Sequence, residues 1–138
     1  MKADRTYVLD ANALLDFIED GPGAAPVERL LGEAHRHNRP LMASVVNLGE
    51  VFYHAWQERG EEVALGTMAG LSRLPIEPIP VDLQQSLKAG EIKAKHKIPY
   101  VDCIAAALAE IREAVLVTSD RDFEKLGRRV RVLWLTRP

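Results

Sequence analysis

Cysteine is nearly absent from this sequence, and no apolar run is long. Cys103 is the only cysteine among 138 residues, so an internal disulfide and a cysteine-based zinc site are both excluded. No apolar run approaches the roughly 20 residues that a membrane span needs, and polar residues interrupt the early apolar runs that a signal peptide would require. We therefore expect a cytoplasmic protein that does not cross a membrane.

A strong overall charge is also absent, because the formal net charge is only −2. The charge is unevenly placed, however, and the stretch KAGEIKAKHK holds a cluster of four lysines, Lys88, Lys93, Lys95 and Lys97. In a helix these lysines would flank one stripe made of Leu83, Leu87, Gly90 and Ala94. Two interpretations are open: a solvated helix whose lysine stems surround a core contact, or a positive rim beside a polyanion site.

Short apolar runs alternate with amphipathic helices, and the chain contains no internal repeat. We expect strands at residues 6–10, 40–43, 76–81, 114–119 and 130–135. The expected helices cover about 12–20, a stretch ending near 37, about 45–58 after an N-cap at Ser44, 61–74, the lysine-rich stretch, and a segment from Pro99 onward. Strands separated by helices predict a mainly parallel sheet covered on both faces, hence a single α/β domain over residues 1–138 with three α/β/α layers.

Two acidic residues stand where predicted strands end. Asp10 closes the first strand in YVLDAN, and Asp120 follows a later strand in LVTSDRDF. The carboxyl ends of parallel strands share one edge, where such sheets bind their ligands. A purely structural explanation is open as well, because Asp10 or Asn12 could cap the next helix, and Ser119 with Asp122 resembles a capping arrangement.

Two further acids lie in the opening halves of predicted helices. Asp102 interrupts the apolar segment IPYVDCIAAALA, and its helical neighbours are alanines rather than the charged residues of a solvent face. A buried charge needs a cation or hydrogen bonds, although a first-turn acid also gains from the helix dipole. Glu50, in SVVNLGEVFYHAW, could equally be an ordinary exposed glutamate. All four acids can converge on one cleft.

The motifs YVLDAN, NLGEVF, PYVDCIAAALA and LVTSDRDF, in this order and spacing, resemble a PIN-domain protein, and most closely the VapC-type toxins of toxin–antitoxin pairs. The resemblance covers nearly the whole chain. It implies an acidic metal site at Asp10, Glu50, Asp102 and Asp120, to which Asp122 adds a further acid. It also matches Asn12 and Thr118 to the small polar residues of that site.

The residues fit this chemistry independently of the resemblance. Carboxylates without a cysteine or a histidine pair select hard cations, so Mg²⁺ or Mn²⁺ is favoured over Zn²⁺. Four like charges in one cleft would raise at least one pKa unless a divalent ion lies among them. We expect a metal-dependent hydrolase of phosphodiester bonds, with Asp10, Asp102 and Asp120 as ligands and Glu50 as a ligand or the base that orients water.

The resemblance makes this hydrolase an endoribonuclease, the toxin of a type II toxin–antitoxin pair, with the four lysines supplying RNA contacts. It also implies a cognate antitoxin and a homodimer. Other interpretations stay open: a phosphoryl-handling enzyme with a strand-end Asp nucleophile, a receiver-type signalling domain, or a catalytically silent PIN-like module that binds RNA or a partner. The usual phosphoryl-handling pattern has a second Asp two residues after the first, and this chain has Asn12 there. The paired acids and the late lysine of a receiver domain are not evident in the sequence.

Overall fold

A central sheet of five parallel strands organises the chain, whose computed structural model describes residues 5–137. The strands are β1 (Tyr7–Leu9), β2 (Leu41–Ser44), β3 (Ile76–Ile79), β4 (Val115–Thr118) and β5 (Val132–Trp134). They lie in the order β3-β2-β1-β4-β5, and every neighbouring pair is parallel. The expectation of a mainly parallel sheet is confirmed.

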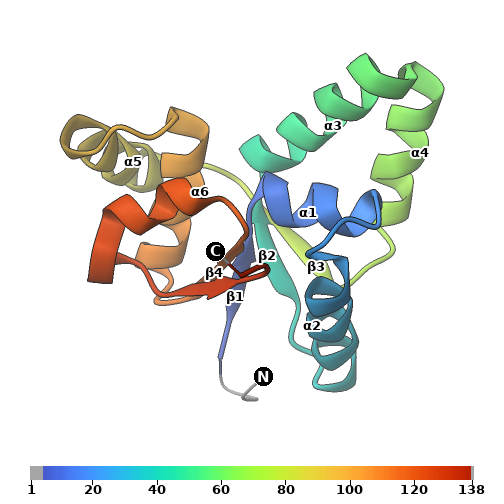
Figure 1. Cartoon of the computed structure of the whole chain (residues 1–138), viewed down its shortest axis with the longest axis horizontal. Coiled ribbons are helices and arrows are strands. Elements are labelled where there is room, and N and C mark those ends of the chain that lie inside the picture. The colour runs from blue at the N-terminus through green and yellow to red at the C-terminus, as the bar shows by residue number, and fades with distance from the viewer. Residues whose placement is uncertain (1–4, 138) are drawn as a thin grey trace.

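Helices cover both faces of this sheet, as Figure 1 shows. They are α1 (Ala11–Ile18), α2 (Ala24–Arg36), α3 (Val45–Arg59), α4 (Glu61–Leu71), α5 (Leu83–Lys95), α6 (Tyr100–Ile111) and the 3₁₀ segment η1 (Arg121–Arg129). Ser44 caps α3 as expected, because its hydroxyl accepts a hydrogen bond from the Val46 amide at 3.2 Å. Among the described residues, no helix combines the length and the apolarity that crossing a membrane would take.

The alternation of side chains along the strands creates two separate cores. Val8 and Leu116 face one side of the sheet, where α5, α6 and η1 pack. Leu9 and Val117, one residue further along, face the other side, where α1, α2 and α3 pack. The three-layer α/β/α architecture is therefore as predicted.

Helix α6 is buried on nearly all sides. Every residue from Cys103 to Ala109 is at most 3% exposed, and the helix contacts three strands as well as α5. Four of these residues are alanines, and their small side chains let neighbouring elements approach the helix closely. The alanines beside Asp102 therefore form an interior surface and not a solvent face.

Helix α5 presents a different face from the one that its apolar pattern indicates. Leu83 and Leu87, expected to lie in the core-contact stripe, are 72% and 66% exposed. The buried side consists of Gln85, Ala89 and Ile92. Burial of Gln85 is possible because its Nε2 donates a hydrogen bond to the Pro80 carbonyl at 3.0 Å, which offsets part of the cost of burying an amide.

Gly90 does not interrupt α5, which is continuous from Leu83 to Lys95. A Cβ at this position would meet no atom of the described residues within 4 Å. The glycine is therefore not required by any close approach between elements.

An arginine joins α5, α6 and η1. The Nε of Arg129 donates to a Glu110 carboxylate oxygen at 2.7 Å, and its Nη2 donates to Glu91 at 2.5 Å. The arginine side chain is only 18% exposed, and charge-assisted bonds of this kind are stronger than neutral ones. Because η1 begins directly after Asp120, this contact also holds the segment that follows the acidic strand end.

We predict that Arg129→Gln lowers the melting temperature by several degrees, since a loss of about 1 kcal/mol shifts the Tm of a domain of this size by roughly 4 °C. Lys95→Gln, which removes an exposed partner of the same Glu91, should change it by about 1 °C or less, because exposed ion pairs contribute little. Thermal unfolding followed by circular dichroism measures both. Equal shifts in the two variants would contradict the role assigned to Arg129.

Candidate metal centre

Asp10 lies at the carboxyl end of β1 and is only 3% exposed. One of its carboxylate oxygens accepts a hydrogen bond from the Ala13 amide at 2.8 Å, which caps α1. The other accepts from the Thr118 hydroxyl at 2.5 Å, at the end of the neighbouring strand β4. Asp10 is thus both the helix cap and a polar link between two strand ends.

Asp120 and Asp122 follow β4. The Asp120 amide donates to the Thr118 hydroxyl at 2.9 Å, and the Asp120 carboxylate accepts from the Asp122 amide at the same distance. Asp120 therefore caps η1, and the capping role considered for Ser119 is not observed. The Ser119 hydroxyl donates instead to the side-chain oxygen of Asn12, and its amide donates to the same oxygen at 3.2 Å.

Three of the predicted acids form a compact group. One carboxylate oxygen from each of Asp102, Asp120 and Asp122 lies within 4.8 Å of the others, and all three residues are partly buried. Asp102 reaches this group from the first turn of α6. Asp10 and Glu50 lie outside the group, although each is close enough to act electrostatically on Asp102.

The group has the electrostatics of a cation site. Burial, followed by the charges of Asp120, Glu50 and Asp122, raises the pKa of Asp102 to about 7, against an ordinary value of about 3.9. Burial is also the main cause that raises the pKa of Asp10 to about 7, against the opposing hydrogen bonds from Thr118 and Ala13. Oxygen-only donors with mutual repulsion suit Mg²⁺ or Mn²⁺, so the residues fit such an ion.

Glu50 lies on α3, and its charge helps to raise the pKa of Asp102. Asn47, one helical turn before it, is a residue for which the sequence predicted no role. Asn47 is 1% exposed, and its Nδ2 lies 3.3 Å from both a Glu50 carboxylate oxygen and the Val101 carbonyl. The Asn47 amide therefore connects Glu50 to the turn that carries Asp102. Its Oδ1 is buried and has no hydrogen-bond partner in the described part of the chain. The signal in the sequence is a polar residue one helical turn before the glutamate.

The four lysines proposed as an RNA rim lie on α5 and just after it, where most have partners. Lys88 is 3.6 Å from both Glu91 and Glu110, and Lys95 is 3.0 Å from Glu91. Lys93 donates to the Ile98 carbonyl at 2.8 Å. Within residues 5–137, only Lys97 of the four has no side-chain partner. Most of the positive charge here is thus already engaged by the protein.

The raised pKa values predict an unusual pH dependence. Asp10 and Asp102 bind protons more tightly in the folded chain than in the unfolded one, so their contribution to stability is fully present below about pH 4 and is lost as the pH rises towards 7. In EDTA, the difference in Tm between Asp102→Asn and wild type should therefore shift in favour of the variant as the pH rises from 5 to 7. Mg²⁺ should raise the wild-type Tm most near pH 7. A difference independent of pH and of Mg²⁺ would contradict this account.

Removal of Asn47 should weaken the metal centre. We predict that Asn47→Ala lowers Mn²⁺ affinity by about 10–100-fold, the usual effect of losing a residue that orients a ligand. It should also lower the free energy of unfolding by about 1–3 kcal/mol, because a buried hydrogen bond is lost. Isothermal titration calorimetry and denaturant unfolding measure the two effects.

Gln85→Ala provides the matched control, because Gln85 is another buried amide with one unpartnered oxygen, located on α5. This variant should lose comparable stability and retain the wild-type Mn²⁺ affinity. If the two variants lose affinity equally, Asn47 acts only through general stability.

Comparisons with known proteins identify a family and several similar structures. The model of the PIN domain family matches residues 7–129. The DNA-bound VapBC structure from Salmonella typhimurium is similar, with a TM-score of 0.76 and 23% identity over 96% of this chain and 99% of that one. VapBC2 from Rickettsia felis, bound to a promoter DNA fragment, has a TM-score of 0.74 and 19% identity, covering 93% and 97%.

A third similar structure is VapC20 from Mycobacterium tuberculosis, described as a sarcin–ricin loop cleaving toxin, with a TM-score of 0.66 and 17% identity over 96% of this chain and all of that one. No curated protein matches the sequence. At these identities the structures establish a shared fold. Together with the family match, which spans most of the residues, they show that this chain belongs to the PIN-domain family.

Proposed function

We propose that this protein is a metal-dependent endoribonuclease and the toxin of a type II toxin–antitoxin pair. The observation that carries the proposal is the meeting of Asp102, Asp120 and Asp122 within 4.8 Å. Membership of the PIN-domain family supports a nuclease, and similarity to toxin–antitoxin structures supports the toxin role. The choice of RNA as substrate rests on the family resemblance.

Each residue has a proposed task. Asp102, Asp120 and Asp122 would hold Mg²⁺ or Mn²⁺, with Asp10 as a further ligand, direct or through water. Such an ion supplies charge neutralisation at the phosphodiester and a water of lowered pKa for in-line attack. Glu50 would orient or deprotonate that water, or join the ligands. Thr118 and Asn12 hold the strand-end loops through hydrogen bonds to Asp10 and Ser119.

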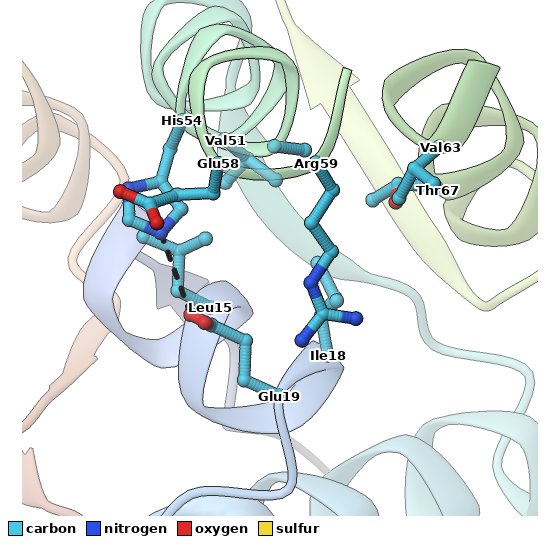
Figure 2. A pocket seen from close by; sticks show the side chains of 10 residues that line it. Leu15, Ile18, Glu19, Val51, His54, Glu58, Arg59, Val63 and Thr67 are labelled. Carbon is cyan, nitrogen blue, oxygen red and sulfur yellow. Dashed lines mark ion pairs between the residues drawn. The ribbon is translucent and has the colours of Figure 1, made fainter. Parts of the chain in front are cut away.

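A cognate antitoxin is part of this proposal, since several similar structures are toxin–antitoxin complexes. A basic side chain of its segment would lie beside the acidic group. A hollow of about 50 Å³ lies between α1, α3 and α4, with the pair formed by His54 and Glu19 at 3.6 Å on its wall (Figure 2). Helices α3 and α4 also carry exposed apolar residues, of which Val63 lines this hollow: Tyr53, Trp56, Val63 and Leu65.

The homodimer expected from the resemblance also remains a proposal. Its support is a group of exposed apolar residues on α5 and at the start of α6, Leu83, Leu87 and Tyr100. The Tyr100 hydroxyl donates to the Ser86 carbonyl at 3.2 Å, which keeps this ring close to α5. Aromatic and aliphatic groups of this kind form the centres of protein interfaces.

An RNA cleavage assay tests the proposed activity. Wild type should cut a panel of structured RNAs in Mg²⁺ or Mn²⁺ and be silent in EDTA. Asp10→Asn and Asp102→Asn should each lose about 100-fold or more in rate, because metal stabilisation is worth several kcal/mol and 1.36 kcal/mol is tenfold.

Glu62→Gln is the matched control, because it removes one exposed carboxylate from α4 without touching the acidic group. It should cleave at the wild-type rate. An inert wild type with both metals would contradict the nuclease, and retained RNA or partner binding would then favour a silent module. Cleavage of phosphomonoesters through a covalent Asp10 intermediate would instead indicate the phosphoryl-handling alternative.

A further inference from the structure

Positive charge without a carboxylate partner among residues 5–137 collects at the edge of the sheet opposite the acidic group. Since all strands are parallel, the residues before each strand lie along one amino-terminal edge. An arginine stands one to three residues before every strand, and we call these five residues the arginine edge: Arg5, Arg39, Arg73, Arg112 and Arg131.

The pairing of the strands orders these arginines in space. The register Val8 to Met42 places Arg5 and Arg39 at matching positions of β1 and β2 extended backwards by three residues. The Leu116 amide donates to the Arg131 carbonyl at 2.8 Å, which fixes Arg131 beside the start of β4. At about 4.8 Å per strand, the arginine edge extends over roughly 20 Å. Its order follows the sheet: Arg73, Arg39, Arg5, Arg112, Arg131.

The arginine edge is not neutralised within residues 5–137. Four of its members are exposed and Arg39 is half-buried, and none lies within 4.0 Å of a described carboxylate. Two exposed acids lie near it, Glu77 and Glu113. The lysine cluster of α5 differs, because two of its four lysines, Lys88 and Lys95, pair with glutamates.

Helix dipoles explain only part of the pattern. Arg39, Arg73 and Arg112 follow the carboxyl ends of α2, α4 and α6, where a cation is favourable. Arg5 follows no described helix, and Arg131 follows only η1, whose exposed Arg128 adds another charge. Arg128 and Arg131 also line a hollow of about 180 Å³ beside Glu113 and Ala114.

We propose that the arginine edge binds backbone phosphates of a long or folded RNA whose cleavage site lies at the acidic group. This deepens the proposed function and rests on it. Guanidinium groups match phosphate oxygens in a two-pronged geometry. None of the large exposed apolar residues among residues 5–137 belongs to this edge, whereas protein interfaces have apolar and aromatic centres. The edge is therefore suited to a polyanion rather than to a protein.

The distance between the two edges sets which RNAs can use both. A strand of four residues spans about 13 Å, so the edges are roughly 15–20 Å apart once the loops are included. A stacked nucleic-acid strand advances by at most about 3.4 Å per nucleotide, the value for B-form DNA. An RNA of about four nucleotides at the acidic group ends before the arginine edge, whereas a folded RNA of about 30 nucleotides can contact both.

Binding by RNAs of increasing length tests this proposal. Fluorescence anisotropy in EDTA, which prevents metal-dependent cleavage, would compare wild type with the double variant Arg5→Gln, Arg131→Gln. The affinity of this variant for the long RNA should fall about tenfold, and the slope of log K against log salt should shrink by about 1.4–1.8, or 0.7–0.9 per lost phosphate contact. The loss should diminish as the RNA is shortened.

The double variant Arg29→Gln, Arg59→Gln is the matched control, since it removes two exposed arginines from α2 and α3 and changes net charge equally. It should bind the long RNA like wild type, and thermal unfolding should show both variants folded. Equal losses in the two double variants, or no loss in either, would overturn the arginine edge. Tighter binding of duplex DNA through the same arginines would overturn its assignment to RNA.

The outcomes separate this inference from the nuclease proposal. A protein that binds RNA through the arginine edge and cuts none contradicts the nuclease alone. A protein that cuts RNA in Mg²⁺ while the Arg5 and Arg131 variant binds like wild type contradicts the arginine edge alone.

Discussion

The carboxylate of Asp10 is the interaction on which the arrangement of the site depends. It accepts hydrogen bonds from the Ala13 amide and the Thr118 hydroxyl, so it starts α1 and joins the ends of β1 and β4. Thr118 in turn accepts from the Asp120 amide and places the next acid. Structural capping and the acidic site are therefore not competing explanations, because the same oxygens serve both.

Much of this architecture was predictable because it depends on local pattern. Strand and helix periodicity indicated the parallel sheet, and the position of Asp10 and Asp120 after strands indicated a shared edge. What the pattern could not indicate was which side of an amphipathic helix meets the core. In α5 the apolar Leu87 is exposed while Gln85 is buried, since the Pro80 carbonyl accepts a hydrogen bond from the Gln85 amide nitrogen. That partner is set by a loop conformation outside the helical pattern.

Charge was the least predictable property, because its effect depends on partners distant in sequence. The high density of lysines in α5 favoured an RNA-binding role, yet Lys88 forms an ion pair with Glu110 of α6. The arginines before the strands are scattered along the chain, and only the parallel topology gathers them. Opposite charges consequently lie at opposite edges of the sheet, with carboxylates at the carboxyl ends of the strands and guanidinium groups before their amino ends.

The alanines of α6 determine how amino-acid substitutions can alter the acidic site. Asp102 is carried by a helix whose depth in the fold is limited by Ala105, Ala106 and Ala109, all fully buried. Interiors are close-packed, so even one added methylene is felt by its neighbours. Substitutions at these apolar positions would therefore change the distances between the acids even if every polar residue of the site stayed the same.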